Sequence, residues 1–380
     1  MGAMYDVIVV GGGPAGSAAA KMAGASGLEV LLLDKEEFPR NKLCGGALSR
    51  RVLSCLGSDI PDPLGEKDIF GMRVRYADRS IEHNKGCRIA TMVTRYRFDD
   101  WLLAQARETG AIIRTGERVI DCRETVDHVE VITAGATYRA RFVIIAEGAQ
   151  GRLKHRVRRR DRKWEYGISM VAAVAADNGE IDARLPGLME LHPGVVHMGY
   201  GWVFPHDGYY SVGVWGPVAY VSEPRRVMGD FLGDNGFTGD YDLRGHVAAM
   251  GGIRRSVVTS RMVLAGDAAG FVDPFSGEGI AFAIRSGQIA AEVIADMVLR
   301  QCHAGHMRAY ERRCHREFGR DFRYALLASR IMNRFPRIFF SILTRSSEAL
   351  DRFLEVPNLK RQYLSYLGWV IPRVPRLIIR

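Results

Sequence analysis

Residues 5–16 read YDVIVVGGGPAG and are followed by a run of small residues, SAAAKMAGA. The β-branched run at 7–10 predicts a buried parallel strand that ends at Gly11, and the small residues predict a helix packed closely on a sheet. Gly11 permits the tight turn, Gly13 lets the backbone approach a pyrophosphate, and Gly16 allows the helix to lie near the strand. This pattern is the dinucleotide-binding fingerprint, in which N–H groups of the helix start face the phosphates.

Asp34 strengthens this interpretation because it ends the next predicted strand, 28–34 (LEVLLLD). Its spacing from the glycines is that of a ribose-binding carboxylate. Glycines in this pattern are weak evidence alone, but a strand, a helix and an acidic residue in the right order exclude most chance glycine turns. The sequence therefore predicts a domain that binds the ADP part of a dinucleotide.

The composition is that of a globular protein, since 47% of the 380 residues are hydrophobic and 25% are charged. This length predicts two domains. No apolar run approaches the roughly 18 residues that span a bilayer, and the start lacks a charged leader, so we expect a cytoplasmic location. Residues 1–3 are interpreted as an expression scar before Met4. The six cysteines form no CxxC pair, so neither a metal site nor a disulfide framework is predicted.

The net charge of +10 belongs to the C-terminal segment, 306–380, which holds 16 Lys and Arg against 6 Asp and Glu. Its cations alternate with large apolar residues, as in NRFPRIFFSIL and GWVIPRVPRLIIR. We expect no nucleic-acid partner because no binding motif accompanies this charge. Peripheral contact with the inner membrane face is one interpretation, and a solvated helical face over a core is the other.

Several segments between these ends have strand patterns. The hairpin pattern of 129–133 with 138–141 is followed by a separate buried strand, 142–146. Three strand-like segments, 168–175, 197–204 and 209–215, predict an antiparallel, substrate-facing sheet, and 70–76 alternates as a separate strand. The run RLKHRVRRRDRK at 152–163 has eight cations against Asp161 alone. It could bind a diphosphate or lipid headgroup, but a solvated surface segment is favoured.

Four motifs together resemble the geranylgeranyl reductase family of FAD-dependent oxidoreductases, which have the aromatic hydroxylase type of flavoprotein fold. They are GGGPAGSAAA at 11–20, PRNKLCGGALS at 39–49, GYGWVFP at 199–205 and GDAAGFVDPFSGEGI at 266–280. The implied fold is α/β, with a Rossmann-type FAD-binding domain, an inserted antiparallel-sheet substrate domain and a helical, basic C-terminal segment. The predicted ranges are 1–70, 95–150 and 255–305 for the first, 71–94 and 151–254 for the second, and 306–380 for the third.

The resemblance implies which residues hold FAD. Asp267 would accept hydrogen bonds from a ribityl hydroxyl, and the helix that starts at Gly279 would stabilise negative charge on the N1–C2 side of a reduced flavin. Arg95 resembles an arginine that contacts the cofactor in relatives. Arg40 and Lys42 have the same interpretation with less support. The implied cofactor-binding residues are Gly11, Gly13, Ala15, Gly16, Asp34, Lys35, Cys44, Gly45, Gly46, Ala47, Arg95, Gly266, Asp267, Gly277, Gly279 and Ile280.

Five residues concern the substrate or depart from the family pattern. Tyr200, Trp202 and Phe204 would border an apolar substrate, with plain core packing as the alternative. Trp215 replaces a glycine that follows the aromatic motif in relatives, so the pocket would have a different shape. Glu147 with its following glycine replaces an Asp-Gly pair, which leaves its contacts open.

Cys44 is the candidate catalytic residue. The resemblance places it near the flavin and the substrate, where it could help to deliver a proton. A thiol with an unperturbed pKa of about 8.5 is a weak acid, and neighbouring Lys42 would favour the thiolate. A purely structural thiol is the alternative interpretation.

These residues predict an FAD-dependent reductase that saturates C=C bonds of a prenyl lipid, quinone or prenyl diphosphate. A flavin-dependent monooxygenase or halogenase is the alternative, because the YxWxFP motif is close to the WxWxIP pattern of halogenases. A prenyl-binding chaperone would have no need of the complete fingerprint. No second GxGxxG is present, so the electron donor is expected to be NAD(P)H that docks transiently, or another reductant such as an iron–sulfur protein or a deazaflavin.

Overall fold

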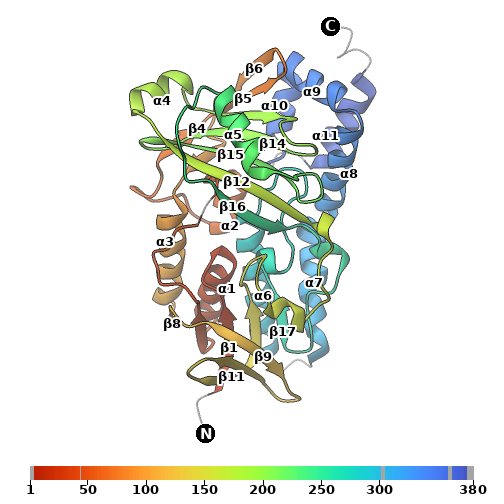
Figure 1. The fold of residues 1–380 in the computed structure, drawn as a ribbon. Coiled ribbons are helices and arrows are strands. Elements are labelled where there is room, and N and C mark those ends of the chain that lie inside the picture. The colour runs from red at the N-terminus through yellow and green to blue at the C-terminus, as the bar shows by residue number, and fades with distance from the viewer. Residues whose placement is uncertain (1–3, 43, 301–303, 358–361, 375–380) are drawn as a thin grey trace.

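The computed structural model describes residues 4–42, 44–300, 304–357 and 362–374, so residues 1–3 and Cys302 lie outside it. A mostly parallel sheet and its helices form one end of the molecule, and a second sheet forms the other (Figure 1). The first sheet has the order β8 (Ile112–Arg114), β2 (Val30–Leu33), β1 (Met4–Val10), β11 (Thr137–Ile145), β10 (Val129–Thr133) and β9 (Val119–Glu124), and β17 (Met262–Leu264) also pairs with β11.

The strand β11 corrects one prediction. The segments 138–141 and 142–146 were predicted as separate strands, but they form one continuous strand. Its first half pairs antiparallel with β10, whereas its second half pairs parallel with β17, and β1 runs parallel along its other edge. The half-exposed first part and the buried second part therefore have different sequence patterns within a single strand.

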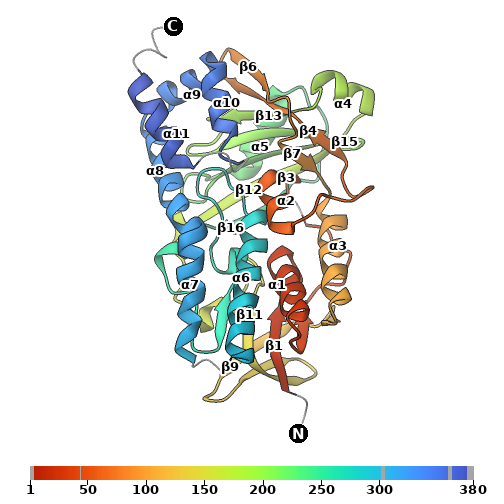
Figure 2. The ribbon, with the colours of Figure 1, turned by 180° about the vertical axis from the view of Figure 1, so that it is seen from behind.

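The helix that follows the fingerprint lies beside the first sheet, between two other helices. The helix α1 (Pro14–Ala25) packs against α6 (Ile280–Leu299) on one side and α3 (Arg95–Glu108) on the other (Figure 2). The approach of α1 to α6 is very close, because a Cβ added at Gly287 would lie 2.1 Å from the carbonyl oxygen of Ala15. The small residues that follow the fingerprint thus bury the helix between its neighbours, as the sequence predicts.

The second sheet is antiparallel except where β13 and β5 run parallel. Its order is β16 (Arg244–Ala249), β12 (Tyr166–Ala175), β15 (Tyr209–Pro217), β14 (Tyr200–Pro205), β13 (Leu188–Pro193), β5 (Gly71–Tyr76) and β6 (Arg79–Asn84). The strands β13 and β16 escaped prediction because their burial does not alternate: the first three residues of β13, including Glu190, are buried, and only the last two residues of β16 are. The predicted strand 197–204 begins only at Tyr200, because Met198 has a positive φ of 59° in the preceding turn.

Smaller elements connect the two sheets. A small sheet joins β3 (Ala47–Ser49) and β4 (Lys67–Ile69) to β7 (Ala90–Met92). It therefore links ranges that the sequence assigned to different domains, and the domain ranges stay a prediction. The remaining helices of this part are α2 (Arg50–Leu56), α4 (Asn178–Arg184) and α5 (Pro224–Asp234).

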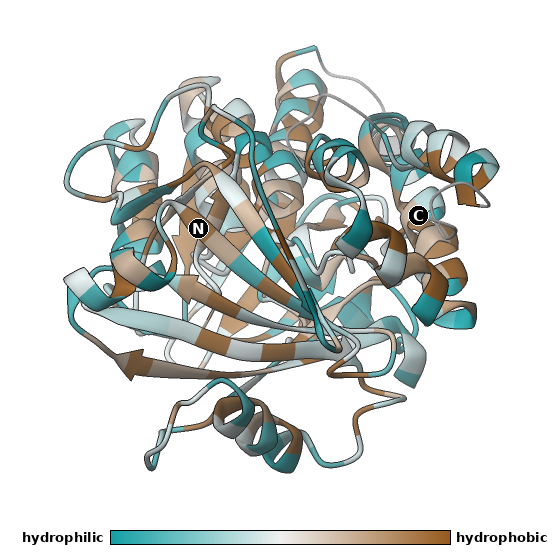
Figure 3. Ribbon diagram, turned by 90° about the horizontal axis from the view of Figure 1, so that it is seen from above, coloured by the Kyte–Doolittle hydropathy of each residue, from teal (hydrophilic) through white to brown (hydrophobic). Residues whose placement is uncertain are grey.

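The C-terminal segment forms helices along the whole length of the molecule (Figure 2). They are α7 (Arg308–Cys314), α8 (Arg320–Arg334), α9 (Pro336–Arg345), α10 (Ser347–Leu354) and α11 (Tyr363–Val370), with a π-helix, His315–Gly319, between α7 and α8. Figure 3 shows hydrophilic and hydrophobic residues alternating around these helices. Most of their apolar side chains pack into a shared core, and no described helix is long and apolar enough to cross a bilayer.

Candidate functional site

A cavity of about 1200 Å³ lies between the two sheets and the C-terminal helices. It brings together residues from all four sequence motifs. The predicted site residues that line it are Gly11, Gly13, Ala15, Asp34, Lys35, Cys44, Gly45, Gly46, Ala47, Arg95, Asp267, Gly277, Gly279, Ile280, Tyr200, Trp202 and Phe204.

Gly16 and Gly266 do not line the cavity, and their predicted contact with the cofactor stays a prediction. A Cβ added at Gly16 would lie 1.7 Å from the carbonyl oxygen of Gly11, so this glycine lets α1 approach β1. Gly266 has a φ of +59°, and its added Cβ would lie 3.0 Å from the Cβ of Ala15. Both glycines therefore position the site through backbone packing.

The start of α1 fits an anionic group. Gly13 occupies the N-cap position, and no side chain caps the helix. Gly11 turns the chain with a φ of +105°, and a Cβ there would lie 2.5 Å from the carbonyl oxygen of Ala146. The N–H groups of an uncapped first turn carry partial positive charge and can bind phosphate oxygens. This glycine-lined cradle fits the diphosphate of a dinucleotide.

Asp34 lies at the end of β2, where it is only 7% exposed. Its Oδ2 accepts a hydrogen bond from the Gly12 N–H at 2.5 Å, and its Oδ1 accepts one from the Glu36 N–H at 2.8 Å. A carboxylate offers about four lone-pair sites, so this residue can still accept a ribose hydroxyl. Lys35 beside it forms an ion pair with Glu36 at 3.4 Å and is half exposed.

Three cations converge near the diphosphate cradle, and one buried carboxylate holds two of them. Arg95 donates from Nε and Nη2 to the two carboxylate oxygens of Asp99, at 2.6 and 2.7 Å. Arg40 lies 3.1 Å from the same carboxylate, which is fully buried. Sequence reasoning missed Asp99, although its spacing of four residues from Arg95 on a helix is a recognisable signal.

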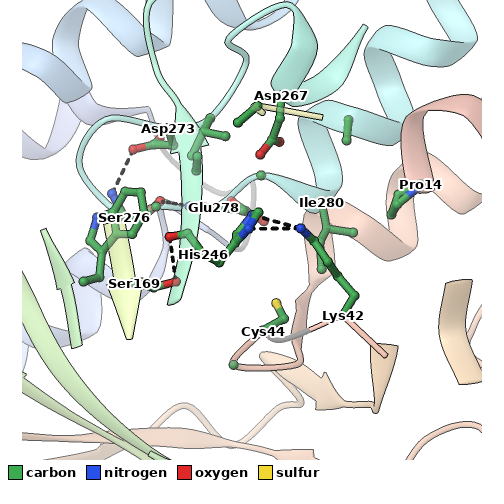
Figure 4. Close-up of a pocket in the computed structure, with 18 of the residues that line it drawn as sticks. Pro14, Lys42, Cys44, Ser169, His246, Asp267, Asp273, Ser276, Glu278 and Ile280 are labelled. Atoms are coloured by element: carbon green, nitrogen blue, oxygen red, sulfur yellow. Dashed lines mark hydrogen bonds between the residues drawn. The ribbon is translucent and has the colours of Figure 1, made fainter. Parts of the chain in front are cut away.

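Lys42 is the third cation, and it contacts a histidine from the second sheet. Its Nζ lies 3.0 Å from Nδ1 of His246 and 3.3 Å from Nε2 (Figure 4). Burial, and then the charge of Arg95, lower the pKa of Lys42 to about 8. Burial, and then the charge of Lys42, lower the pKa of His246 to about 3, so this histidine is neutral. Burial raises the pKa of nearby Asp267. His246 was not predicted, because no motif marks β16.

The lowered pKa of Lys42 makes cofactor binding depend on pH. We expect FAD affinity to be constant below pH 8 and to fall above it until it levels off near the affinity of a variant without this charge, because neutral Lys42 no longer attracts the diphosphate. FAD titrations of the apoprotein between pH 7 and 10 measure this slope. The variant K42M should remove the slope and bind more weakly at pH 7, whereas K42R should bind well at every pH. If the FAD affinity of K42R still fell above pH 8, Lys42 would not be the cause of the pH dependence.

The start of α6 is a second uncapped helix end at the cavity. Gly279 is its N-cap and has no capping side chain. Glu278 turns toward α2 instead: its Oε1 accepts a hydrogen bond from Ser49 Oγ at 2.5 Å, and its Oε2 lies 3.8 Å from Arg51. Burial raises the pKa of Glu278. The free N–H groups at this helix start fit the electron-rich edge of a flavin.

Two open questions from the sequence are answered by local contacts. Glu147 accepts a hydrogen bond from the Lys154 N–H at 3.1 Å and so caps the short helix Leu153–Arg156. The cationic run 152–163 is solvated only in part, because Lys154 and Arg158 are buried. Both pair with the buried carboxylate of Asp161, at 3.5 and 2.9 Å. These two cations therefore share one carboxylate within the fold.

The aromatic motif lies on β14 and faces the cavity. The rings of Tyr200, Trp202 and Phe204 follow one another with centroids 6.2 and 6.0 Å apart. Trp215, which replaces a glycine of the family pattern, packs on Gly277: a Cβ added there would lie 3.0 Å from its ring. These aromatic side chains line the cavity and also pack on one another, and their contact with a substrate stays a prediction.

Cys44 is partly buried on the loop below the Lys42–His246 pair (Figure 4). Burial opposes the charge of Arg95, but Asp99 and then Cys44, which lies close by, raise the pKa of that guanidinium. Its carbonyl oxygen accepts a hydrogen bond from Ser211 Oγ at 3.5 Å. The cysteine thus lies between the cationic group and the aromatic strand.

Comparisons with known proteins agree with this geometry. Residues 4–320 match the FAD binding domain family. The chain is 31% identical to a menaquinone reductase of Mycobacterium tuberculosis over 315 residues, 76% of each chain. It is 33% identical to a geranylgeranyl diphosphate reductase of Rhodobacter capsulatus over 309 residues, 76% of this chain and 74% of the relative. The chain belongs to the geranylgeranyl reductase family of FAD-dependent oxidoreductases. Its cofactor is FAD and it is an oxidoreductase, as the sequence predicted.

Solved structures share the fold. A geranylgeranyl bacteriochlorophyll reductase-like protein of Thermoplasma acidophilum superposes with a TM-score of 0.80 at 22% identity, over 98% of both chains. A flavin-dependent brominase superposes with a TM-score of 0.75 at 20% identity, over 98% of this chain and 100% of the brominase. The predicted α/β fold class is therefore confirmed.

Proposed function

We propose that this oxidoreductase saturates C=C bonds in the prenyl chain of a lipid or prenyl diphosphate. The observation that carries this proposal is the apolar end of the cavity. Strands β5 and β13 form one side of it, and the C-terminal helices α9 and α10 form the other. Its lining residues are Met72, Val74, Ile89, Met189, Leu191, Phe339, Phe340, Leu343, Phe353 and Val356.

This apolar end suits a long hydrocarbon chain. The ten side chains named above are uncharged, and Arg51 of the same cavity donates a hydrogen bond to the carbonyl oxygen of Val356 at their edge. Burial of each methylene group of a substrate contributes about 0.8 kcal/mol. Half of these lining residues come from the C-terminal segment, 306–380, whose apolar residues were interpreted from the sequence as suited to a long lipid substrate. The apolar residues of that segment thus have a use inside the protein.

The chain's own groups would prepare the reaction. The start of α1 and Asp34 would hold the ADP part of FAD, and when bound the cofactor supplies a hydride to the substrate. An isolated alkene accepts hydride poorly, so the site must stabilise positive charge on carbon or protonate it early. The ring faces of Tyr200 and Trp202 can stabilise such charge. We propose Cys44 as the proton donor.

The experiment is anaerobic photoreduction of the holoenzyme, followed by reoxidation with geranylgeranyl lipids and mass analysis of the product. Saturation predicts a gain of two mass units for each reduced bond. Reoxidation only by O2, with an oxygenated or halogenated product, would instead establish the monooxygenase or halogenase alternative.

The variant C44A should keep FAD and photoreduction but lose about 100-fold in saturation rate if the thiol donates the proton. An unchanged rate would exclude that role.

The depth of the apolar end should decide which chain lengths react. We expect L343W to fill part of it and to lower kcat/KM for geranylgeranyl substrates on the order of tenfold relative to geranyl substrates. Leu364 lies in the same C-terminal segment but is 40% exposed, so L364W is the matched control and should leave the preference unchanged. Steady-state assays with the two chain lengths check this. Equal effects of the two variants would contradict the assigned path.

We also propose contact with an anionic membrane through the turn between α8 and α9. Residues 334–338 (RFPRI) are all exposed, and Phe335 and Ile338 are 50% and 39% exposed. Arginines beside exposed apolar side chains favour an anionic lipid surface. The variant F335S/I338S should bind phosphatidylglycerol vesicles at least about tenfold more weakly than wild type in flotation assays. V126S is the control, because Val126 is exposed but lies far from this turn in the sequence. Absence of vesicle binding by the wild type would refute the proposal.

A further inference from the structure

His206 follows β14 directly and is buried, with 1% of its surface exposed. Its Nδ1 lies 2.5 Å from Oε2 of Glu66, and its Nε2 lies 3.1 Å from the carbonyl oxygen of Gly45. The Tyr209 ring stacks on the imidazole at 4.5 Å, and its hydroxyl lies 3.0 Å from Nδ1. Neither the catalytic proposal nor any sequence motif accounts for this buried histidine.

The hydrogen-bond partners of the two ring nitrogens of His206 determine how many protons His206 and Glu66 hold together. The Gly45 carbonyl oxygen can only accept a hydrogen bond, so Nε2 must carry a proton. The second bond, between Nδ1 and the Glu66 carboxyl group, needs one proton more. The histidine and the glutamate therefore hold two protons between them, which is one more than a neutral imidazole beside a carboxylate would hold.

The surroundings of Glu66 indicate where that second proton lies. Its Oε1 accepts a hydrogen bond from the Thr94 N–H at 3.1 Å. Burial opposes ionisation, but the hydrogen bond and charge of His206 hold the pKa of Glu66 below its ordinary value. Burial raises the pKa of Tyr209, so its hydroxyl stays neutral. These contacts fit an ionised Glu66 beside an imidazole that has a proton on each ring nitrogen.

This pair holds the loop that carries Cys44. Gly46 adopts a φ of +74°, and a Cβ added there would lie 2.6 Å from the His206 ring and 2.4 Å from the Val93 carbonyl oxygen. The Gly46 carbonyl oxygen accepts a hydrogen bond from the Val93 N–H at 2.9 Å. Phe204, two residues before the histidine, lies against Gly45 from the same strand end, where an added Cβ would be 3.0 Å from its ring. The loop is therefore enclosed by β14 and by the residues after β7.

We propose that His206 is a positively charged positioning residue that locks the Cys44–Gly46 loop to the end of β14. It fixes the distance between the thiol and the aromatic strand by donating one hydrogen bond to the loop and one to Glu66. The inference rests on the FAD site, which contains this loop, but not on the proposed prenyl reduction. Its tests therefore use readouts other than turnover.

The first test is nitrogen NMR of the holoenzyme with ¹⁵N-labelled histidine rings at pH 7.5. The His206 signals are assigned by their loss in H206Q. Both nitrogens are expected at imidazolium shifts, and E66Q should convert His206 to the neutral form, because an amide side chain can donate to Nδ1. An unprotonated ring nitrogen in wild type, or a doubly protonated ring in E66Q, would overturn the proposal.

The second test is the alkylation rate of Cys44 in the holoenzyme, followed by peptide mass analysis. In H206Q the amide oxygen would face the Glu66 carboxylate, so the loop should open and the rate should rise on the order of tenfold. E66Q keeps both hydrogen bonds and should keep the wild-type rate. H155Q, at an exposed histidine, is the matched control for the substitution itself. A wild-type rate in folded H206Q would overturn the proposal, and if H206Q fails to fold, a raised rate in E66Q would do so.

Discussion

Replacing Gly16 by alanine is expected to abolish FAD retention and to destabilise the protein by more than about 3 kcal/mol. The new Cβ would lie 1.7 Å from the carbonyl oxygen and 2.9 Å from the carbonyl carbon of Gly11. Both atoms belong to the backbone, so no rotamer change can relieve the overlap. Helix α1 would have to move away from β1, and its uncapped N–H groups would leave the diphosphate cradle.

The measurements are FAD stoichiometry from the absorbance of the purified protein and the urea midpoint of unfolding. Gly229 provides the control, because it lies in helix α5 with nothing within 4 Å of an added Cβ. G229A should leave FAD binding unchanged and gain up to about 1 kcal/mol from helix propensity. Full FAD binding by G16A would show that the contact between α1 and β1 can relax without loss of the site.

The FAD site was predictable from sequence wherever its geometry is local. The turn at Gly11 and the uncapped start at Gly13 need specific residues within a short stretch, so the pattern itself records the structure. The same is true of Asp267 and the helix start at Gly279. The resemblance to the family predicted that these segments belong to one site, and in the structure their residues line one cavity.

The parts that were missed depend on residues that meet only in the folded chain. His246 reaches Lys42 from an edge strand 204 residues away, and β16 has no motif. His206 contacts Glu66 across 140 residues. The C-terminal helices were predicted from charge and alternation alone, and those patterns cannot say whether an apolar face meets a core, a membrane or a substrate path. In this fold Phe340 and its neighbours face the cavity.

The second large effect is expected for D99N, which should destabilise the apoprotein by about 3–5 kcal/mol. Asp99 is fully buried and is the carboxylate partner of Arg95, and Arg40 lies 3.1 Å from it. Burial opposes the charge of Arg95, but Asp99 raises the pKa of this arginine above its usual value. An asparagine would leave two cations beside each other without their negative partner. Urea unfolding of the apoprotein measures the loss.

Adding FAD shows whether Arg95 and Arg40 only stabilise the fold or also bind the cofactor. If Arg95 and Arg40 contact the diphosphate, removal of the Asp99 charge leaves them free to bind it, so FAD should stabilise D99N by more than it stabilises wild type. Asp100 is the control: it is only partly buried, and the described residues contain no ion pair to it, so D100N should change neither value. An arginine that contacts the diphosphate should bind it more tightly once the competing Asp99 carboxylate is removed. Equal stabilisation of D99N and wild type by FAD would therefore show that these arginines only stabilise helix α3.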